Sequence, residues 1–402
     1  MMSIVYLILA VGIIFFYYIK YRDILQPNMI FLAVWFLSAA VSSPDVSPYL
    51  NKWSYQMHLI VLLSGISFWF GTFTVLGKYK LNRSNILRKT QNISALYNRL
   101  VVVLFIICIS AAILEWINGG AKFSFLELGN IEGTDVKSEI DGSIPGVHYA
   151  TIFLPFVSIF SFYSLMNTNK YRITNIIIII SSIFCSFVFN LSRGDLLIFI
   201  LSFVFIYSRY KIFSIKKVIF ISLLIVGMFL GIMVLRVNKE TLVFMMTDNP
   251  YFSVFYSYVA PCYANLNDLV NSELDYMPYG NATFAPIWTI LGIKDDLPVT
   301  TIDQLGVFNA RTYLYGFYHD YKYFGIIIFP YIIGYLVSKI YVGTRLKSAY
   351  WIILLAALQK AVMNGFFGNY FFGEMVILFP YLMITSVIIF LMLNENKIVI
   401  AK

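Results

Sequence analysis

His319 and Asp320 are the neighbouring residues in this 402-residue chain best suited to moving a proton. Only three histidines are present, and this one stands beside a carboxylate just before a long apolar run. An imidazole, or a carboxylate in an apolar setting, can remove the proton of a hydroxyl group. The competing interpretation is a polar pair at a helix start, where Asp320 caps the helix. Both interpretations place the pair at the edge of an apolar helix.

Three arginines border apolar runs and are candidate ligands for an anion. Arg193 opens one run, Arg236 ends another, and Arg311 precedes His319 by eight residues. A guanidinium group forms a planar fork that matches phosphate oxygens, and a helix N-terminus adds partial positive charge. Each arginine alone is more often an interface anchor that reaches toward water. At one level on one face of a membrane, the three would hold a lipid diphosphate.

The composition requires a lipid environment. Hydrophobic residues make up 60% of the chain and charged residues only 12%, against about 25% charged residues in soluble domains. The formal net charge of +9 does not indicate a nucleic-acid partner, because the basic residues lie in short loops between apolar runs. Three cysteines give no disulfide framework, and the first apolar run has the features of an uncleaved span.

The apolar runs predict an all-α polytopic membrane protein of about 11 transmembrane helices, since about 17–22 apolar residues cross the hydrocarbon layer. We interpret residues 1–402 as one membrane-embedded domain. The predicted spans are 3–19, 28–43, 56–77, 99–117, 147–167, 173–190, 194–209, 216–235, 323–341, 348–367 and 374–393.

The loops on the two sides of these spans differ in Lys and Arg content. One side carries eighteen and the other nine, of which five belong to the large loop 236–322 between spans 8 and 9. The positive-inside rule therefore predicts an outer N-terminus, a cytoplasmic C-terminus and an outer large loop. Lys360 is a charge inside a predicted span, where it faces the bundle interior or reaches the interface.

The large loop 236–322 is too long and too polar for a simple connector. It contains nine of the chain's twenty carboxylates and an aromatic run over residues 251–263. Thirteen residues are too few to cross a bilayer, so this run predicts an interfacial or re-entrant amphipathic helix. Long ordered loops are usually functional, and we expect this one to form the lid of an active site.

Several motif classes are missing from the sequence. There is no zinc-ligand spacing, P-loop, dinucleotide-binding glycine pattern, nucleophile elbow or C-x-x-C pair. We therefore expect no metal and no cofactor, and no nucleotide-dependent site on the cytoplasmic side.

The layout and several short motifs resemble the bacterial oligosaccharide repeat-unit polymerases (Wzy type) of O-antigen and capsule synthesis. The similarity comprises the eleven spans, the Arg193-Gly194 pair at an outer helix start, and the late outer loop. Asn309-x-x-Thr312 followed by Asp320-x-x-x-x-Gly325 also looks like the stretch that follows this loop in the family. The family more often has glycine two residues after the aspartate, where this chain has Lys322.

The resemblance implies a metal-independent glycosyltransferase at the outer face of the bacterial cytoplasmic membrane. Its donor is a glycan on undecaprenyl diphosphate, and its acceptor is a hydroxyl of another lipid-linked repeat unit. Arg193, Arg236 and Arg311 would bind the diphosphate, and His319, Asp320 or another loop carboxylate would take the acceptor proton. The expected partners are these lipid-linked oligosaccharides, the bilayer and a chain-length-regulating co-polymerase, with no nucleic acid.

Two alternatives stay open. An O-antigen ligase, which transfers finished glycan from the same carrier to lipid A core, would share the large outer loop and the arginines. A lipid-linked oligosaccharide flippase or another transporter is the non-enzymatic alternative. A flippase is expected to have two related halves and charges along a central cavity, whereas charges within the predicted spans are sparse here.

Overall fold

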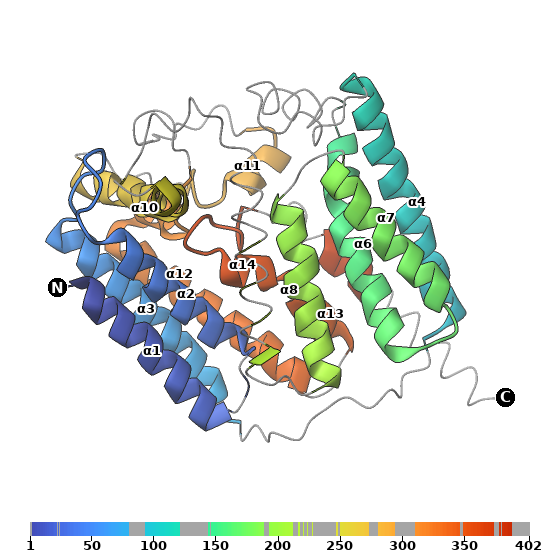
Figure 1. The fold of residues 1–402 in the computed structure, drawn as a ribbon, viewed down its shortest axis with the longest axis horizontal. Coiled ribbons are helices and arrows are strands. Elements are labelled where there is room, and N and C mark those ends of the chain that lie inside the picture. The colour runs from blue at the N-terminus through green and yellow to red at the C-terminus, as the bar shows by residue number, and fades with distance from the viewer. Residues whose placement is uncertain are drawn as a thin grey trace. The chain divides into compact units, whose positions relative to one another are not determined.

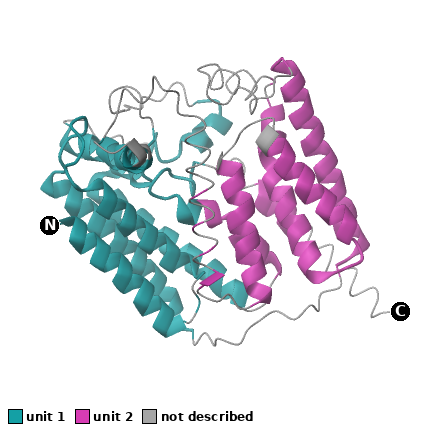
Figure 2. Cartoon of the chain, in the orientation of Figure 1, with its two compact units in different colours: residues 1–84, 244–346, 361–378 teal, residues 85–243, 347–360, 379–402 magenta. Residues whose placement is uncertain are grey.

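The computed structural model describes most of the chain, as helices joined by turns and loops. The described residues are 2–21, 23, 25–79, 93–120, 144, 146–188, 193–211, 216–217, 220, 223, 227, 247, 250–272, 280–293, 310–345, 349–373, 378 and 380–387. Every regular element within these ranges is an α-helix. The chain divides into two compact units, coloured separately in Figure 2: unit 1 is 1–84, 244–346 and 361–378, and unit 2 is 85–243, 347–360 and 379–402.

Unit 1 is organised around two long helices that pack against each other, α3 (Tyr55–Leu76) and α12 (Leu314–Arg345). Glycines allow this close approach. A Cβ atom at Gly71 would overlap the carbonyl oxygen of Tyr331, and one at Gly334 would overlap that of Phe68. The remaining helices of the unit are α1 (Met2–Tyr21), α2 (Pro27–Ser42), α10 (Pro250–Asn271) and α11 (Ala285–Ile290), as labelled in Figure 1.

Helix α10 lies across one end of the α1–α3 bundle and corresponds to the aromatic run at 251–263 (Figure 1). It contacts α2 and the connection between α2 and α3, and it also reaches the segment before α12, where Asn265 donates to the carbonyl oxygen of Ala310 at 2.8 Å. The hydroxyl of Tyr263 is 2.8 Å from that of Ser38, and the side-chain oxygen of Asn267 accepts the backbone N–H of Ser54 at 2.9 Å. The helix is longer than the run that predicted it, and its transverse position fits an interfacial element.

The opposite end of unit 1 is held by an ion pair and is rich in cations. Arg345 Nη2 lies 2.5 Å from Asp23 Oδ2, and Tyr341 donates its hydroxyl to the same carboxylate oxygen at 2.7 Å. Lys20 Nζ lies 5.5 Å from the ring centroid of Phe73, near the end of α3. The last turn of α12 is therefore tied to the α1–α2 connection, far along the helix from His319.

Unit 2 is built on α6 (Val147–Asn167), whose two faces are largely buried. Three aromatic residues of α6 surround the ring of Tyr381, the nearest two being Phe156 at 5.0 Å and Phe160 at 5.1 Å. At the end of the helix, the side-chain amide of Asn167 donates to the hydroxyl of Tyr210 at 2.6 Å. The neighbouring helices are α4 (Ala95–Asn118), α7 (Arg172–Val188), α8 (Arg193–Tyr210) and α13 (Ala349–Ala357), and α14 (Gln359–Met363) follows α13.

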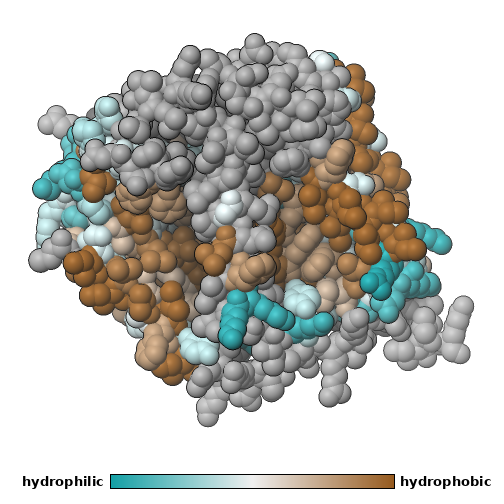
Figure 3. Space-filling view, viewed as in Figure 1, coloured by the Kyte–Doolittle hydropathy of each residue, from teal (hydrophilic) through white to brown (hydrophobic). Residues whose placement is uncertain are grey.

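The exposed faces of several helices are apolar. On α1, Ile4, Ile8, Val11 and Phe15 are each more than half exposed. Figure 3 shows comparable hydrophobic side chains over much of the described surface. Apolar faces this extensive are unfavourable in water and favourable in a bilayer, so the chain is a helical membrane protein.

Among the described residues, five helices are long and apolar enough to cross a membrane: α1, α3, α4, α6 and α12. Helices α2 and α7 are shorter apolar helices, and the spans predicted around residue 191 are two separate helices, α7 and α8. The predicted span 348–367 contains α13 and α14, and Lys360 lies in α14. Most of the predicted span 216–235 lies outside the described residues. Of the predicted span 374–393, only 378 and 380–387 are described. The count of eleven spans therefore stays a prediction.

Candidate functional site

His319 and Asp320 lie in the first part of α12, which begins at Leu314, inside the loop predicted from the sequence. The backbone N–H of Tyr313, directly before the helix, donates to the carbonyl oxygen of Gly365 at 2.8 Å and fixes the entry of the chain. The side chains of the pair are almost fully buried, with 1% of His319 and 0% of Asp320 exposed. The pair is therefore held inside unit 1 and does not project from its surface.

The carboxylate of Asp320 is held by a turn that lies about forty residues earlier in the chain. The backbone N–H groups of Ala282 and Thr283 donate to its two oxygens, at 3.3 Å and 2.7 Å. Thr283 also donates its hydroxyl to the carbonyl oxygen of Gly316 at 3.1 Å, which brings the turn onto the same helix. Because its oxygens accept bonds from another segment, Asp320 does not act as the helix cap of the competing interpretation.

The turn that supplies these N–H groups depends on glycine. Gly280 has a φ of +67°, a conformation that residues with a Cβ atom rarely adopt. A Cβ atom there would also lie 2.5 Å from the hydroxyl of Tyr321 and 2.7 Å from the ring of Phe284. The backbone N–H of Phe284 closes the turn on the carbonyl oxygen of Gly280 at 2.9 Å. A small residue is therefore needed for the turn to reach Asp320.

Asp320 also fixes the orientation of the imidazole. His319 Nδ1 lies 2.7 Å from Asp320 Oδ1. A carboxylate only accepts hydrogen bonds, so Nδ1 carries a hydrogen, and in a neutral imidazole Nε2 is then the nitrogen with the lone pair. Within the described part of the chain, Nε2 is buried and has no hydrogen-bond partner. A buried polar atom without a partner is costly, so Nε2 can accept a hydrogen bond from any donor that reaches it.

A backbone distortion follows the pair directly. Lys322 has φ 49° and ψ −135°, and it is the position at which α12 changes direction. It is the one residue other than glycine with positive φ in the described ranges. Its ammonium group lies 5.4 Å from the ring centroid of Tyr318. The sequence-based boundary at residue 323 thus coincides with a kink.

The three candidate arginines are described to different extents. Arg311 is half-buried, its guanidinium carbon lies 4.8 Å from the ring centroid of Tyr315, and it precedes α12 by three residues. Arg193 begins α8 in unit 2, and its side chain lies outside the described part. Arg236 also lies outside it. The structure brings Arg311 and the His319–Asp320 pair onto one segment of unit 1, and the cluster of three arginines stays a prediction.

The other two histidines have ordinary hydrogen-bond partners, as expected from their positions near span ends. His58 Nδ1 lies 2.9 Å from the hydroxyl of Tyr6, and His148 Nδ1 lies 3.2 Å from Glu115 Oε1. Glu115 is 1% exposed, and sequence reasoning did not single it out. The available signal was a lone carboxylate near the end of the predicted span 99–117.

Within the described ranges, no three His, Cys, Asp or Glu side chains come together as potential ligands of one metal ion. The candidate site is defined by the buried His319–Asp320 pair, the N–H groups that hold Asp320, and the kink at Lys322. Comparisons with family models, with curated proteins and with solved structures each find no match to this chain.

Proposed function

We propose that this chain is a membrane-embedded glycosyltransferase that joins lipid-linked oligosaccharide repeat units into O-antigen or capsular polysaccharide. The donor is a glycan on a polyprenyl diphosphate, and the acceptor is a hydroxyl of a second lipid-linked unit. The apolar helical architecture supports access to a lipid carrier. The resemblance in layout to the repeat-unit polymerases supports the choice of reaction.

The buried His319–Asp320 pair is the observation that carries the proposal. Its orientation is that of a general base, with Nδ1 bound to the carboxylate and Nε2 free to accept a proton. The acceptor oxygen forms a bond to the anomeric carbon of the donor, and its proton passes to Nε2 of His319. The bond from that carbon to the diphosphate oxygen breaks, and its electron pair leaves with the lipid diphosphate.

Asp320 acts through His319. Its bonds to the N–H groups of Ala282 and Thr283 fix the carboxylate, and the carboxylate fixes the imidazole ring. Because His319 is buried, the acceptor reaches Nε2 when local packing in unit 1 opens. A base in this role contributes about 10²–10⁴-fold to rate.

The leaving diphosphate needs positive charge near the reacting bond. Arg311 lies on the same segment as His319 and is the arginine best placed for this role. We assign Arg193 and Arg236 to the same anion, as the sequence predicts. Guanidinium groups at a leaving diphosphate stabilise the charge that develops in the transition state.

The proposal places the reaction at the outer face of the cytoplasmic membrane. Within unit 1, the end with Lys20 and the Asp23–Arg345 pair is the one that the positive-inside rule assigns to the cytoplasm. Helix α10 and the 43–54 loop occupy the other end. His319 precedes the kink, whereas Arg345 ends α12, so the pair belongs to the half away from the cationic end.

The test is complementation of a deletion strain, with surface polysaccharide resolved on a gel. His319→Ala should abolish long chains and leave single repeat units, and added imidazole should restore part of the ladder. His58→Ala is the matched control, since His58 also has a hydrogen-bonded imidazole in unit 1 but should keep the ladder. Membrane levels of each variant are measured in parallel. Long chains at normal levels in both His319→Ala and Asp320→Ala would contradict the proposal.

The arginines need a separate test, since the structure relates only Arg311 to the pair. Arg193→Ala and Arg311→Ala should each remove the long chains, and the corresponding lysine variants should keep only part of them, because an ammonium group cannot form the planar fork. If either alanine variant makes long chains at normal levels, that arginine has no role at the diphosphate. Loss of attachment to lipid A core with polymer still made would instead indicate a ligase.

A further inference from the structure

Helix α11 and the turn that follows it carry an exposed apolar surface that the proposed reaction does not use. They lie in unit 1, at the end where α10 lies (Figure 1). The sequence has no charged residue between positions 280 and 293, and charged residues return at 294–296. Four large apolar side chains are exposed, and we call them the α11 patch: Ile287 at 37%, Ile290 at 66%, Leu291 at 60% and Ile293 at 39%.

Polar groups in and around the patch are bonded within the same segment. The backbone N–H of Ile293 donates to the carbonyl oxygen of Trp288 at 3.1 Å. The hydroxyl of Thr289 donates to the carbonyl oxygen of Ala285 at 2.9 Å, and the indole N–H of Trp288 donates to that of Gly280 at 3.2 Å. A backbone that enters lipid hydrocarbon needs its polar groups bonded internally. These bonds therefore suit α11 to contact with acyl chains.

A contact with α12 shows how deep α11 begins. The ring centroid of Phe284, directly before α11, lies 6.2 Å from that of Phe329 on α12. Phe329 follows the start of the predicted span at 323 by about six residues, which is about 9 Å along a helix axis. Interfacial helices bury their apolar face about 5–10 Å into the boundary between headgroups and acyl chains. The start of α11 is therefore at the depth expected of an interfacial helix.

The part of α12 next to this contact also exposes apolar side chains. Between the kink at Lys322 and Phe329, Phe324 is 66% exposed and Ile327 is 45% exposed. Because α12 is long and apolar enough to cross a membrane, these side chains face lipid. A protein partner would bring polar groups to the rim of its interface, and the segment 280–293 offers no charge to pair with them. Lipid is therefore the occupant that fits the α11 patch.

We infer that α11 is an interfacial anchor, which inserts the α11 patch among the acyl chains of the outer leaflet. The positive-inside rule assigns this end of unit 1 to the outer face. The anchor acts on the candidate site through Trp288, whose bond to Gly280 ties α11 to the turn that holds Asp320. An anchored α11 keeps this turn at the membrane boundary, the level at which a lipid diphosphate lies. This last step rests on the proposed function, whereas the contact with lipid does not.

The test attaches a fluorescent NBD probe to Ile290→Cys in the full-length protein, in nanodiscs of phosphatidylcholine. The three native cysteines are buried, and the native protein measures any labelling of them. Quenching by lipids with a doxyl group near the top of the acyl chain reports contact with hydrocarbon, and quenching by iodide reports contact with water. The doxyl lipids should quench the Ile290→Cys probe strongly, and iodide should quench it little.

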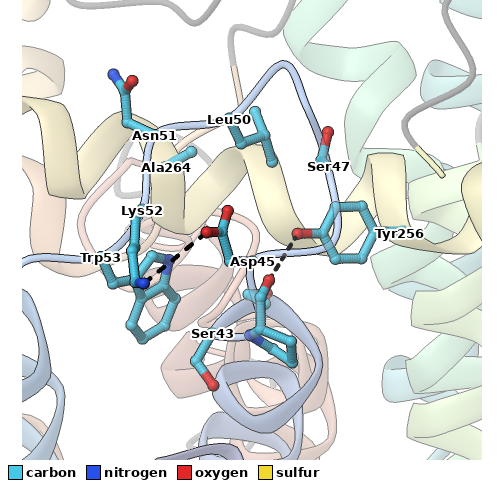
Figure 4. A pocket seen from close by; sticks show the side chains of 11 residues that line it. Ser43, Asp45, Ser47, Leu50, Asn51, Lys52, Trp53, Tyr256 and Ala264 are labelled. Atoms are coloured by element: carbon cyan, nitrogen blue, oxygen red, sulfur yellow. Dashed lines mark hydrogen bonds and ion pairs between the residues drawn. The ribbon is translucent and has the colours of Figure 1, made fainter.

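Two control positions bracket this result. Ile8→Cys on α1 is the lipid-facing control, because Ile8 is 64% exposed. It lies about six residues into its helix, which is again about 9 Å. Lys52→Cys is the water-facing control, since the Lys52 side chain is 80% exposed and lies 4.0 Å from Asp45 in the 43–54 loop (Figure 4). Quenching by the doxyl lipids at Ile290→Cys should equal that at Ile8→Cys and exceed that at Lys52→Cys.

Two outcomes overturn the inference. In the first, iodide quenches the Ile290→Cys probe as strongly as the Lys52→Cys probe, which means that the patch lies in water. In the second, neither quencher reaches the Ile290→Cys probe, which means that protein covers the patch. Because Ile290 is largely exposed, its substitution should leave the fold intact.

The effect on the site is tested in the complementation assay. Ile290→Asp should reduce the long chains, because a carboxylate is excluded from hydrocarbon and releases the anchor. Ile290→Leu is the matched control and should keep the ladder. If Ile290→Asp makes long chains at normal levels, α11 does not position the turn.

The two proposals fail in different ways. If the Ile290→Cys probe contacts lipid but His319→Ala keeps the ladder, the polymerase proposal fails and the anchor stands. If His319→Ala abolishes the ladder but the Ile290→Cys probe lies in water, the polymerase proposal stands and the anchor fails.

Discussion

Replacing Lys322 by glycine should stabilise the protein, because this lysine occupies a backbone conformation that glycine adopts more easily. Its φ of 49° and ψ of −135° lie where a Cβ atom is strained. Residues held in such sparsely populated regions cost about 1–3 kcal/mol. Glycine loses roughly 0.5–1 kcal/mol more backbone entropy on folding than alanine. Removing the Cβ atom should therefore yield a net gain of about 1 kcal/mol, within a range of roughly 0–2.5 kcal/mol.

Lys322→Ala is the control for the effect of removing the Cβ atom at this position. Both variants lose the contact between the ammonium group and the ring of Tyr318, at 5.4 Å, and only the glycine variant loses the Cβ atom. Their difference therefore reports the strain that glycine relieves minus the larger backbone entropy that glycine loses on folding.

The assay is thermal unfolding of the purified variants in one detergent at one scan rate, because unfolding of large proteins is often irreversible. A gain of 1 kcal/mol shifts Tm by about 2–4 °C in domains of 150–250 residues, and by less in a longer chain. We expect Lys322→Gly to melt about 1–3 °C above Lys322→Ala. The polysaccharide ladder should be retained. If the alanine variant melts above the glycine variant, the strain at this position is smaller than the entropy that glycine loses on folding, and the reasoning fails.

Two further predictions concern packing and charge in unit 1. Gly71→Ala should destabilise the protein by about 1–3 kcal/mol, since the new Cβ atom would overlap the Tyr331 carbonyl oxygen. Gly12→Ala, within α1 where nothing lies within 4 Å of the new Cβ atom, should instead keep or slightly raise Tm in the same thermal scans, because alanine loses less backbone entropy in a helix. Burial raises the pKa of Asp268, although a hydrogen bond from Asn51 opposes the shift. An acid with a raised pKa in the fold loses stability as pH rises through its ordinary value near 4. Asp268→Asn should therefore raise Tm at pH 7, and this gain should vanish near pH 4 in a pH series of melting curves.

The sequence alone indicates much of this helical architecture, because the apolar runs are long and have clear ends. The predicted span 147–167 has the bounds of α6, and the span predicted from residue 323 starts at the kink in α12. The aromatic run at 251–263 predicted a helix, and α10 extends beyond it at both ends. Local sequence patterns are enough to predict these helices, because each helix satisfies its own backbone hydrogen bonds.

The arrangement around Asp320 was not predictable in the same way. The N–H groups of Ala282 and Thr283 are nearly forty residues away, and no periodic pattern relates them to the carboxylate. The contact of the buried Glu115 was unpredictable for the same reason, since its partner His148 follows the predicted outer loop in the sequence. Contacts of this kind depend on tertiary packing, which hydrophobic periodicity does not encode.

The strained conformation of Lys322 and the fixed carboxylate of Asp320 support each other. Beyond the kink, α12 packs closely against the residues that precede it, since a Cβ atom at Gly325 would overlap the carbonyl oxygen of Phe317. On the other side, the turn at Ala282 and Thr283 holds Asp320 by two N–H groups. The contact between Gly325 and Phe317 could not form if α12 continued straight through Lys322, because a straight helix would carry Phe317 away from Gly325. We therefore infer that this packing, next to the carboxylate held by the turn, maintains the kink despite its strain. This coupling explains in physical terms why the one strained residue of the described chain lies two positions from its only buried His–Asp pair.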